Sequence, residues 1–313
     1  MTEELYSTCL PLLIPTQNNK NDHGLGRDLW TINPSSTSSN HLEMYKFVGA
    51  LMGMAFTAGQ IIDLKFPSLF WKKFIDDPIT FEDLHNSDAY AIQAIKEVEK
   101  IKSEVTKEIF ESEMKLTWTT QLSNGETVPI VSGGADKPVL YEEVEEYHKL
   151  VLKIRSEEGL KQLEAIKEGF EIIFPISILK ILTWRDVEER VRGPSKISIT
   201  TLQSITQYIQ WQHDNDYVNR FWRVFEEFSN EKRSMFLKFV WGRARLPPLE
   251  SLKEVEFKLH LFDEDRYTDH DSYLPEAHTC FFQLDLPRYT TDEICRSKIM
   301  YAIHSCGSID NDQ

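Results

Sequence analysis

The spacing of hydrophobic residues changes along this chain, and the change restricts its fold more than any other sequence feature. From about residue 41 to residue 105, apolar residues recur at the intervals typical of helices. Between Lys115 and Val131 they alternate instead, on both sides of Asn124-Gly125. Alternating runs joined by Asn-Gly are the strongest short signal for a β-hairpin. The sequence therefore predicts an α+β protein whose first part is mostly helical and contains one hairpin.

The other elements follow from the same two periods. Alternation predicts a strand at 255–262, and an apolar run at 279–286, ended by Pro287, predicts another. Gly49 and Gly53 in the first long helix would allow close packing of a second helix. Helices are predicted at 41–58, 66–75, 87–105, 142–152, 159–173, 182–191, 199–208, 216–228, 231–241 and 291–303.

A break in the helical pattern divides the chain. Gly193-Pro194-Ser195 is the best candidate for a hinge, and 313 residues suffice for two lobes. We predict a loop-rich or poorly ordered segment at 1–40, a mostly helical first lobe at 41–192, the hinge at 193–196, and a smaller mixed α/β lobe at 197–313.

Composition excludes several classes of function. A net charge of −15 repels nucleic-acid phosphates, so no nucleic-acid partner is expected. The longest apolar run, 47–56, is too short to span a bilayer, and the first residues do not read as a signal peptide. The four cysteines form no C-x-x-C pair, so we expect neither a metal site nor a cofactor. The chain reads as cytoplasmic, with reduced thiols.

Cys280 is the residue most suited to chemistry. A single cysteine is usually an apolar core residue. Here, however, His278 and Thr279 precede it, and polar neighbours are unusual beside a buried thiol. The local signatures of papain-like and caspase cysteines are absent, which makes a cysteine hydrolase improbable.

An ordered set of motifs resembles the catalytic domain of HECT-type ubiquitin ligases. The segment L-P-E-A-H-T-C-F around Cys280, with Leu284, Leu286, Pro287 and Tyr289 after it, is similar to that family's active-site signature. Upstream segments match in the same order: 47–53 (FVGALMG), 69–72 (LFWK), 130–139 (IVSGGADKPV), 190–193 (RVRG), 221–222 (FW), 239–242 (FVWG) and 245–247 (RLP). The tail at 306–310 most resembles the HECT type that carries an N-terminal DOC-like module.

The resemblance implies a bilobal fold and a transferase activity. Cys280 would accept ubiquitin from a ubiquitin-conjugating enzyme as a thioester and pass it to a lysine of a protein substrate. His278 and Thr279 would support this step by orienting the loop or by donating hydrogen bonds, and His278 is also a candidate acid or base. Arg245 would hold acidic groups or the ubiquitin tail, although a structural salt bridge is the preferred interpretation.

The resemblance also implies where the conjugating enzyme docks. That site would lie on a subdomain of the first lobe, at about 80–150. The candidate contacts are Ile95, Val98, Phe110 and Met114, although apolar residues at helical spacing are more often core.

Two departures from the family pattern leave an alternative open. Phe282 stands where the family usually has Asn, and we expect part of the family's first lobe to be missing from this chain. The alternative is a catalytically weak relative that acts as a scaffold and binds ubiquitin or the conjugating enzyme. The family's Phe near the terminus is also replaced by the ending I-D-N-D-Q.

Overall fold

A computed structural model describes residues 4–7, 9–211, 216–262 and 269–309. The chain divides into two compact units, each described below by itself. Unit 1 comprises Met1–Ala58 and Leu64–Glu188, and unit 2 comprises Gly59–Asp63 and Glu189–Gln313. The boundary falls a few residues before the predicted end of the first lobe, within helix α10 (Trp184–Arg192).

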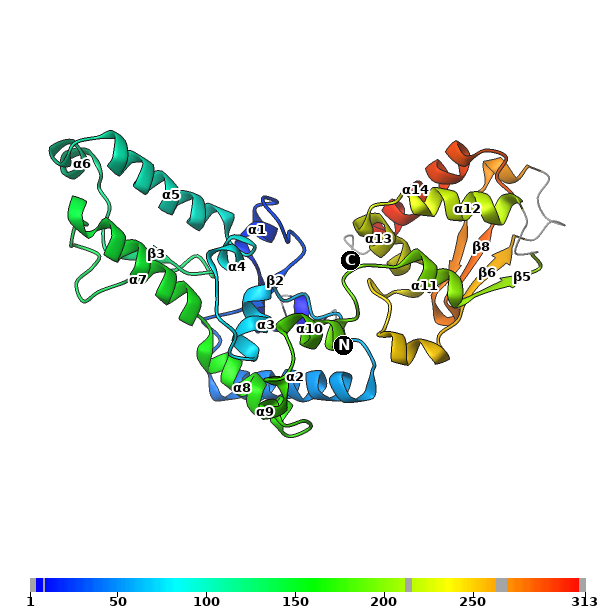
Figure 1. Ribbon diagram of the computed structural model, residues 1–313, viewed down its shortest axis with the longest axis horizontal. Helices are drawn as coiled ribbons and strands as arrows, with labels where there is room; N and C mark the ends of the chain where they lie inside the picture. The colour runs from blue at the N-terminus through cyan, green and yellow to red at the C-terminus, as the bar shows by residue number, and fades with distance from the viewer. Residues whose placement is uncertain (1–3, 8, 212–215, 263–268, 310–313) are drawn as a thin grey trace. The chain divides into compact units, whose positions relative to one another are not determined.

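Unit 1 is mostly helical (Figure 1). Its strands form two small antiparallel pairs, β1 (Leu13–Pro15) with β2 (Trp30–Ile32), and β3 (Thr119–Gln121) with β4 (Thr127–Pro129). Short 3-10 turns are η1 (Glu4–Tyr6) and η2 (Tyr141–Glu143). Its helices are α1 (Gln17–Lys20), α2 (Ser39–Ala58), α3 (Ser68–Phe74), α4 (Phe81–His85), α5 (Ala89–Glu104), α6 (Lys107–Glu113), α7 (Val144–Glu157), α8 (Leu160–Glu171) and α9 (Ile176–Leu179).

Two glycines bring α2 and α8 into backbone contact. A Cβ added to Gly49 would lie 1.9 Å from the carbonyl oxygen of Ile166, and one added to Gly169 would lie 1.8 Å from that of Lys46. Both helices run side by side in Figure 1. Only glycine permits this approach, so the close packing predicted from the small residues of α2 is confirmed.

The hairpin predicted around Asn124-Gly125 is also confirmed. Strands β3 and β4 pair with Gln121 opposite Thr127, and Gly125 adopts a φ of +88° in the turn. The hairpin belongs to an arm built from α5, α6 and α7, whose small core contains Phe110 and Trp118.

The segment 1–40, predicted to be loop-rich or poorly ordered, also contains short regular elements among its turns. β1, α1 and β2 lie there, and Asn18 is fully buried. The Asn18 amide donates to the carbonyl oxygens of Leu25 and His85, and its oxygen accepts from the backbone N–H of Ala89. One polar side chain thus satisfies backbone groups that the polar sequence suggested were open to water.

Unit 2 is built on a four-stranded sheet with the order β5-β6-β8-β7. β5 (Thr206–Ile209), β6 (Phe257–Leu261) and β8 (Gln283–Leu286) are parallel, and β7 (Glu276–His278) runs antiparallel at the edge. The other elements are α11 (Ile199–Ser204), α12 (Asp216–Glu226), α13 (Asn230–Trp241), η3 (Leu249–Glu254), η4 (His270–Ser272), η5 (Thr279–Phe281) and α14 (Asp292–Ile309).

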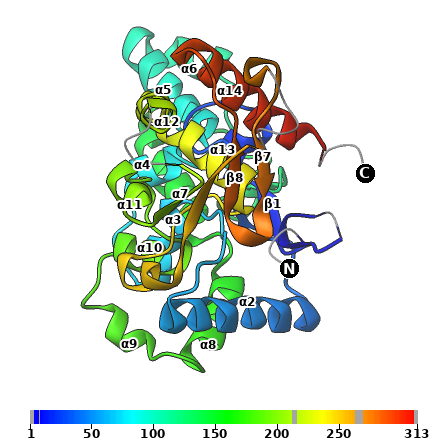
Figure 2. The same cartoon turned by 90° about the vertical axis from the view of Figure 1, so that its right-hand side faces the viewer.

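One face of this sheet carries the core of unit 2. Phe221 and Phe225 of α12, Phe236 of α13 and Ile299 of α14 are buried in the same cluster as the strand residue Leu284. Figure 2 shows β7 and β8 beside α13 and α14. The smaller mixed α/β lobe predicted for the end of the chain is therefore an α/β layer pair with one hydrophobic core.

An ion cluster fastens α14 to α12. Asp292, in the first turn of α14, accepts from Arg220 Nε at 3.0 Å and from Arg223 Nη2 at 2.9 Å. The hydrogen bond from Arg223 lowers the pKa of the Asp292 carboxyl below its usual value. The bond keeps the carboxylate charged at the N-terminal end of a helix, where a negative charge is also favoured by the helix dipole.

The helix predicted at 199–208 is wrong in its second half. α11 ends at Ser204, and Thr206–Ile209 forms the edge strand β5. The Thr206 hydroxyl donates to the carbonyl oxygen of Leu202, which closes the last turn of the helix. Parallel pairing with β6 then sets the conformation of these four residues, and a run this short carries no periodic signal of its own.

Gly193 lies where the hinge was predicted and is tightly enclosed in unit 2. It has a φ of +83°, and an added Cβ would lie 2.1 Å from the carbonyl oxygen of Leu246. Its own carbonyl oxygen accepts from Arg245 Nη1 at 3.0 Å. The Ser195 carbonyl oxygen accepts from Asn230 Nδ2 at 2.7 Å. The hinge remains a prediction, and the structure adds that this segment is bonded to the rest of unit 2.

Replacing Gly193 should therefore destabilise the fold. We expect Gly193→Ala to lower the free energy of unfolding by at least about 2 kcal/mol, because it combines a left-handed backbone with a clash against backbone. Urea unfolding would measure the change. Gly242→Ala is the matched control, since Gly242 has a φ of +70° with nothing within 4 Å of an added Cβ. It should cost only about 1 kcal/mol, and equal losses would contradict the clash.

Candidate functional site

Cys280 lies at the centre of a short turn between two strands. Thr279–Phe281 forms η5, which connects the edge strand β7 to β8. The prediction of one strand over 279–286 is therefore wrong in its first half, because the chain turns before β8 begins at Gln283. The turn leaves Cys280 exposed, which a thiol needs if it is to meet a protein-bound thioester.

The buried side chain of Phe282 anchors the turn that contains Cys280. It is 3% exposed and has a φ of +47°, a left-handed conformation that is uncommon for a large residue. Its ring stacks on Trp241 with centroids 4.3 Å apart and lies 5.0 Å from the ring of Phe257. Its carbonyl oxygen accepts from the backbone N–H of Lys258. The aromatic contacts thus offset a strained backbone at the residue that ends the turn.

The neighbouring aromatic residue points the other way. Phe281 is 65% exposed, although it follows Cys280 directly and precedes the buried Phe282. An exposed phenyl ring beside the exposed thiol of Cys280 offers apolar area to a protein partner.

The other described cysteines differ from Cys280 in environment. Cys295 on α14 is buried, and burial raises the pKa of its thiol to about 12. Such a thiol is almost entirely protonated near neutral pH, and the thiolate is the nucleophilic form. Cys9 is exposed but lies in unit 1. Among the described thiols, Cys280 alone combines exposure with a place on a rigid strand connection.

His278 and Thr279, the predicted supporting residues, lie on the same strand connection as Cys280. His278 ends β7, and its Nε2 atom is 3.2 Å from Oδ2 of Asp285 on β8. The carbonyl oxygen of Thr279 accepts the N–H of Phe282, which closes η5. Both side chains are exposed. Their predicted roles in the reaction remain predictions.

Asp285 and His260 also lie near this turn, and they were not among the residues predicted from the sequence. Asp285 accepts from Gln283 Nε2 at 2.6 Å and lies 3.3 Å from Nδ1 of His260 on β6. The position of His260 could have been predicted from the alternation of β6. His260 has the opposite parity from the buried Phe257, Leu259 and Leu261. It must therefore lie on the face of the sheet away from the core.

Two of the residues predicted to contact a conjugating enzyme are interior. Ile95 is 5% exposed and Phe110 is 1% exposed, so they serve the core of the arm instead of a partner. Val98 and Met114 are partly buried and pack against the same core cluster as Phe110. These assignments are wrong for Ile95 and Phe110, because helical spacing marks the core as readily as it marks an interface. The exposed apolar residues of this arm include Ile109 on α6 and Leu140 before η2, besides Tyr90 at the start of α5.

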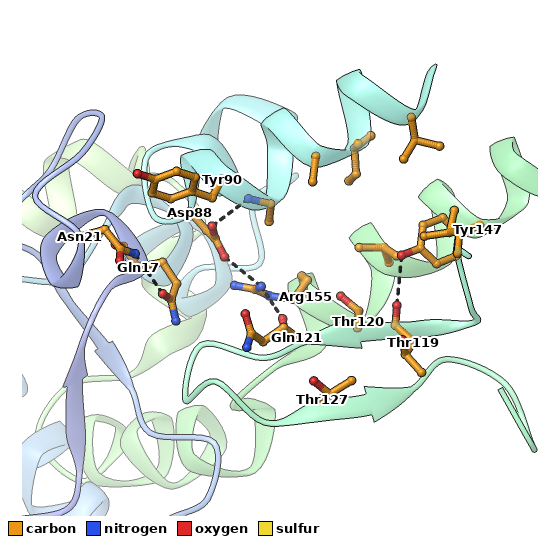
Figure 3. Close-up of a pocket in the computed structure, with 16 residues that line it drawn as sticks. Gln17, Asn21, Asp88, Tyr90, Thr119, Thr120, Gln121, Thr127, Tyr147 and Arg155 are labelled. Atoms are coloured by element: carbon orange, nitrogen blue, oxygen red, sulfur yellow. Dashed lines mark hydrogen bonds and ion pairs between the residues drawn. The ribbon is translucent and has the colours of Figure 1, made fainter. Parts of the chain in front are cut away.

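The arm also holds an open pocket, which Figure 3 shows between α5, the hairpin and α7. Its volume is about 720 Å³. At one end the buried Arg155 guanidinium binds Asp88 at 3.0 Å and the carbonyl oxygen of Gln121 at 2.6 Å. Arg155 also contacts Glu158 at 3.1 Å. It therefore links two helices and the hairpin, and its charge is already paired.

Arg245, a candidate for holding acidic groups, lies in unit 2 beside the predicted hinge. Arg245 Nη1 donates a hydrogen bond to the carbonyl oxygen of Gly193, and this bond holds the segment around Gly193 in place. The tail compared with the DOC-linked type, 306–310, begins within α14, and its last residue lies outside the described residues.

The described residues show neither a metal-binding cluster nor a membrane-spanning helix. Within the described ranges, no cluster of three or more His, Cys, Asp or Glu side chains is arranged to hold a metal ion. No helix in that part of the chain is long and apolar enough to cross a bilayer.

Comparison with known proteins decides the family. Residues 12–311 match the family described as HECT-domain (ubiquitin-transferase). The chain belongs to this family. The fold and the enzyme class predicted from the motifs around Cys280 are thereby confirmed for the HECT domain.

Two relatives share most of this HECT domain. E3 ubiquitin-protein ligase HERC2 of Mus musculus is 34% identical over 311 residues, which cover 99% of this chain and 6% of that protein. E3 ubiquitin-protein ligase HUWE1 of Mus musculus is 32% identical over 290 residues, which cover 90% of this chain and 6% of that protein. The chain thus spans a small fraction of these relatives' length.

Exchanging Phe282 should show how far the turn depends on its ring. We expect Phe282→Asn to lower the free energy of unfolding by about 2 kcal/mol, because the lost aromatic burial outweighs the relief of the left-handed backbone. Phe281→Asn, on the exposed neighbour, should change it by less than about 0.5 kcal/mol. Thermal or urea unfolding of both variants measures the difference, and similar losses would refute the anchoring role.

Proposed function

We propose that this HECT domain is the catalytic part of a ubiquitin-protein ligase. Cys280 accepts ubiquitin from a conjugating enzyme as a thioester and passes it to a lysine of a protein substrate. The observation that carries the proposal is the exposed Cys280 on an anchored turn, in a chain of the ubiquitin-transferase family. The names of the relatives, E3 ubiquitin-protein ligases, support the same activity.

The chemistry requires little from the protein. The Cys280 thiolate attacks the thioester carbonyl on the conjugating enzyme, and the enzyme's own thiolate leaves, so one C–S bond replaces another. A lysine amine then attacks the Cys280 thioester, the new C–N bond forms and the C–S bond breaks. Such steps depend mainly on bringing the reacting groups together.

We further propose that the reaction takes place in a reducing, intracellular compartment. The nucleophile must stay a free thiol, and such compartments keep thiols reduced.

The conjugating enzyme is proposed to dock at the end of the arm formed by α6 and η2. Ile109 is 50% exposed and Leu140 is 42% exposed, and the two elements are in contact. Charged residues border them, including an ion pair between Lys107 and Glu142 at 2.7 Å. Exposed apolar groups with a charged rim are a usual composition for a protein interface.

A charging assay tests the proposed function. The protein is mixed with ubiquitin, activating enzyme, ATP and a panel of conjugating enzymes. We expect a ubiquitin adduct that a reductant removes and that Cys280→Ala abolishes, while Cys9→Ala retains it. Binding of the conjugating enzyme or of ubiquitin without an adduct would instead favour the scaffold alternative.

The docking surface has its own test. Ile109→Asp should slow charging from a conjugating enzyme about tenfold, which corresponds to roughly 1.4 kcal/mol of lost binding. Charging from ubiquitin linked as a thioester to a small thiol bypasses docking and should be unchanged. Ile172→Asp is the matched control, because Ile172 is 69% exposed and lies outside the arm at the end of α8. Unchanged charging by Ile109→Asp would refute the docking assignment.

A further inference from the structure

The sheet of unit 2 has a polar face opposite its core. Phe257, Leu259 and Leu261 of β6 are buried toward the helices, so Lys258 and His260 lie on the other side. The register places His260 beside Asp285 of β8, and Asp285 opposite Glu276 of the edge strand. These three residues therefore form one row across three strands.

The neighbouring row on the same face contains His278. The register pairs Lys258 with Gln283 and Gln283 with His278. His278 thus stands diagonally from Asp285, a separation that long side chains can span. His278 is the last residue of β7 and stands two residues before Cys280, at the start of the turn that carries the thiol.

Asp285 is the centre of the contacts on this face. One carboxylate oxygen, Oδ2, lies 3.2 Å from Nε2 of His278. The other, Oδ1, accepts from Gln283 Nε2 at 2.6 Å and lies 3.3 Å from Nδ1 of His260. The Asp285 side chain is 18% exposed and that of His278 is 43% exposed. The carboxylate is thus held in place, while the imidazole can be reached from solvent.

We propose that Asp285 is a positioning residue for His278 in transfer of ubiquitin to lysine, an inference that rests on the proposed function. An ionised carboxylate only accepts hydrogen bonds, so it holds His278 in the tautomer that carries its proton on Nε2. The Nδ1 atom is then the nitrogen with a lone pair. A carboxylate behind the ring also stabilises the cation that forms when Nδ1 takes a proton.

Transfer to lysine releases one proton from the attacking nitrogen. The lysine nitrogen attacks the thioester carbonyl of Cys280 and gains a positive charge. His278 Nδ1 takes the proton from that nitrogen, the C–S bond breaks, and Sγ leaves as a thiolate. The C–N bond of the product remains. The imidazolium then returns its proton to the thiolate or to water, so that no oxidant or further reactant is needed.

Several charged groups share this face and affect its pH dependence. His260 on β6 is close enough to compete for the same carboxylate. Glu276 on β7 adds a second negative charge opposite Asp285, and Lys258 on β6 adds a positive charge in the neighbouring row. Protonation of His260 would draw Asp285 toward it and weaken its hold on His278.

The test separates charging from discharge. Cys280 is charged with ubiquitin supplied as a thioester of a small thiol, and discharge to free lysine is followed between pH 6 and pH 9. We expect Asp285→Asn to charge like the wild type but to discharge about five- to tenfold more slowly near pH 7, less than the roughly hundredfold that a general base can contribute. Its pH–rate profile should also shift, because the negative charge behind the imidazole is gone.

Two further variants keep the result interpretable. Asp285→Glu retains the charge and should keep the wild-type shape of the pH profile. Asp271→Asn makes the same chemical change at a residue that binds Thr290, and it should leave both steps unchanged. Thermal unfolding checks that each variant is folded.

The outcomes distinguish this inference from the proposed function. A wild-type protein that does not charge at Cys280 would overturn the proposed function and this inference with it. A wild type that charges, with an Asp285→Asn variant that discharges at the same rate at every pH, would overturn the positioning role alone. So would a variant whose charging and discharge fall equally with no change in pH profile.

Discussion

The burial of Phe282 is the constraint on which the arrangement around Cys280 depends. Its ring fills the space between Trp241 and Phe257, and this forces the backbone into a left-handed conformation at the start of β8. Because the chain turns there, β8 runs antiparallel to the preceding strand β7, and Cys280 lies in the turn that connects them. The register that follows brings His278 to Asp285. One hydrophobic contact thus sets both the exposure of the thiol and the polar contacts near it.

Much of the fold could be predicted because long periodic segments record which face is buried. The helices containing Gly49 and Ile92 and the hairpin at Asn124-Gly125 were found in this way. Edge strand β5 was missed, because four residues show no period and their conformation depends on pairing with β6, about fifty residues later in the chain. The first strands were missed for a similar reason, since their segment is held by the buried amide of Asn18. Contacts between distant residues leave little trace in local sequence.

The sequence located a candidate site but not its geometry. Motif order pointed to Cys280 as the candidate nucleophile, while the apolar run after it suggested a strand, because a sequence does not show that Phe281 faces solvent and Phe282 faces the core. The predicted contacts with the conjugating enzyme are wrong at Ile95 and Phe110, because helical spacing does not distinguish core residues from surface residues. Asp285 carried no signal by itself, and its importance depends on the register of three strands.

The reciprocal contact of Gly49 and Gly169 has a consequence for how this family member can vary. Each glycine faces a backbone carbonyl group of the other helix, so no side chain at the partner position could shrink to make room for a larger residue. Core residues commonly change in pairs, so that one becomes larger while its neighbour becomes smaller. Such a paired change is not possible here. Sequences that keep α2 and α8 at this separation must keep both glycines, whereas the rest of the unit 1 core can be exchanged piece by piece.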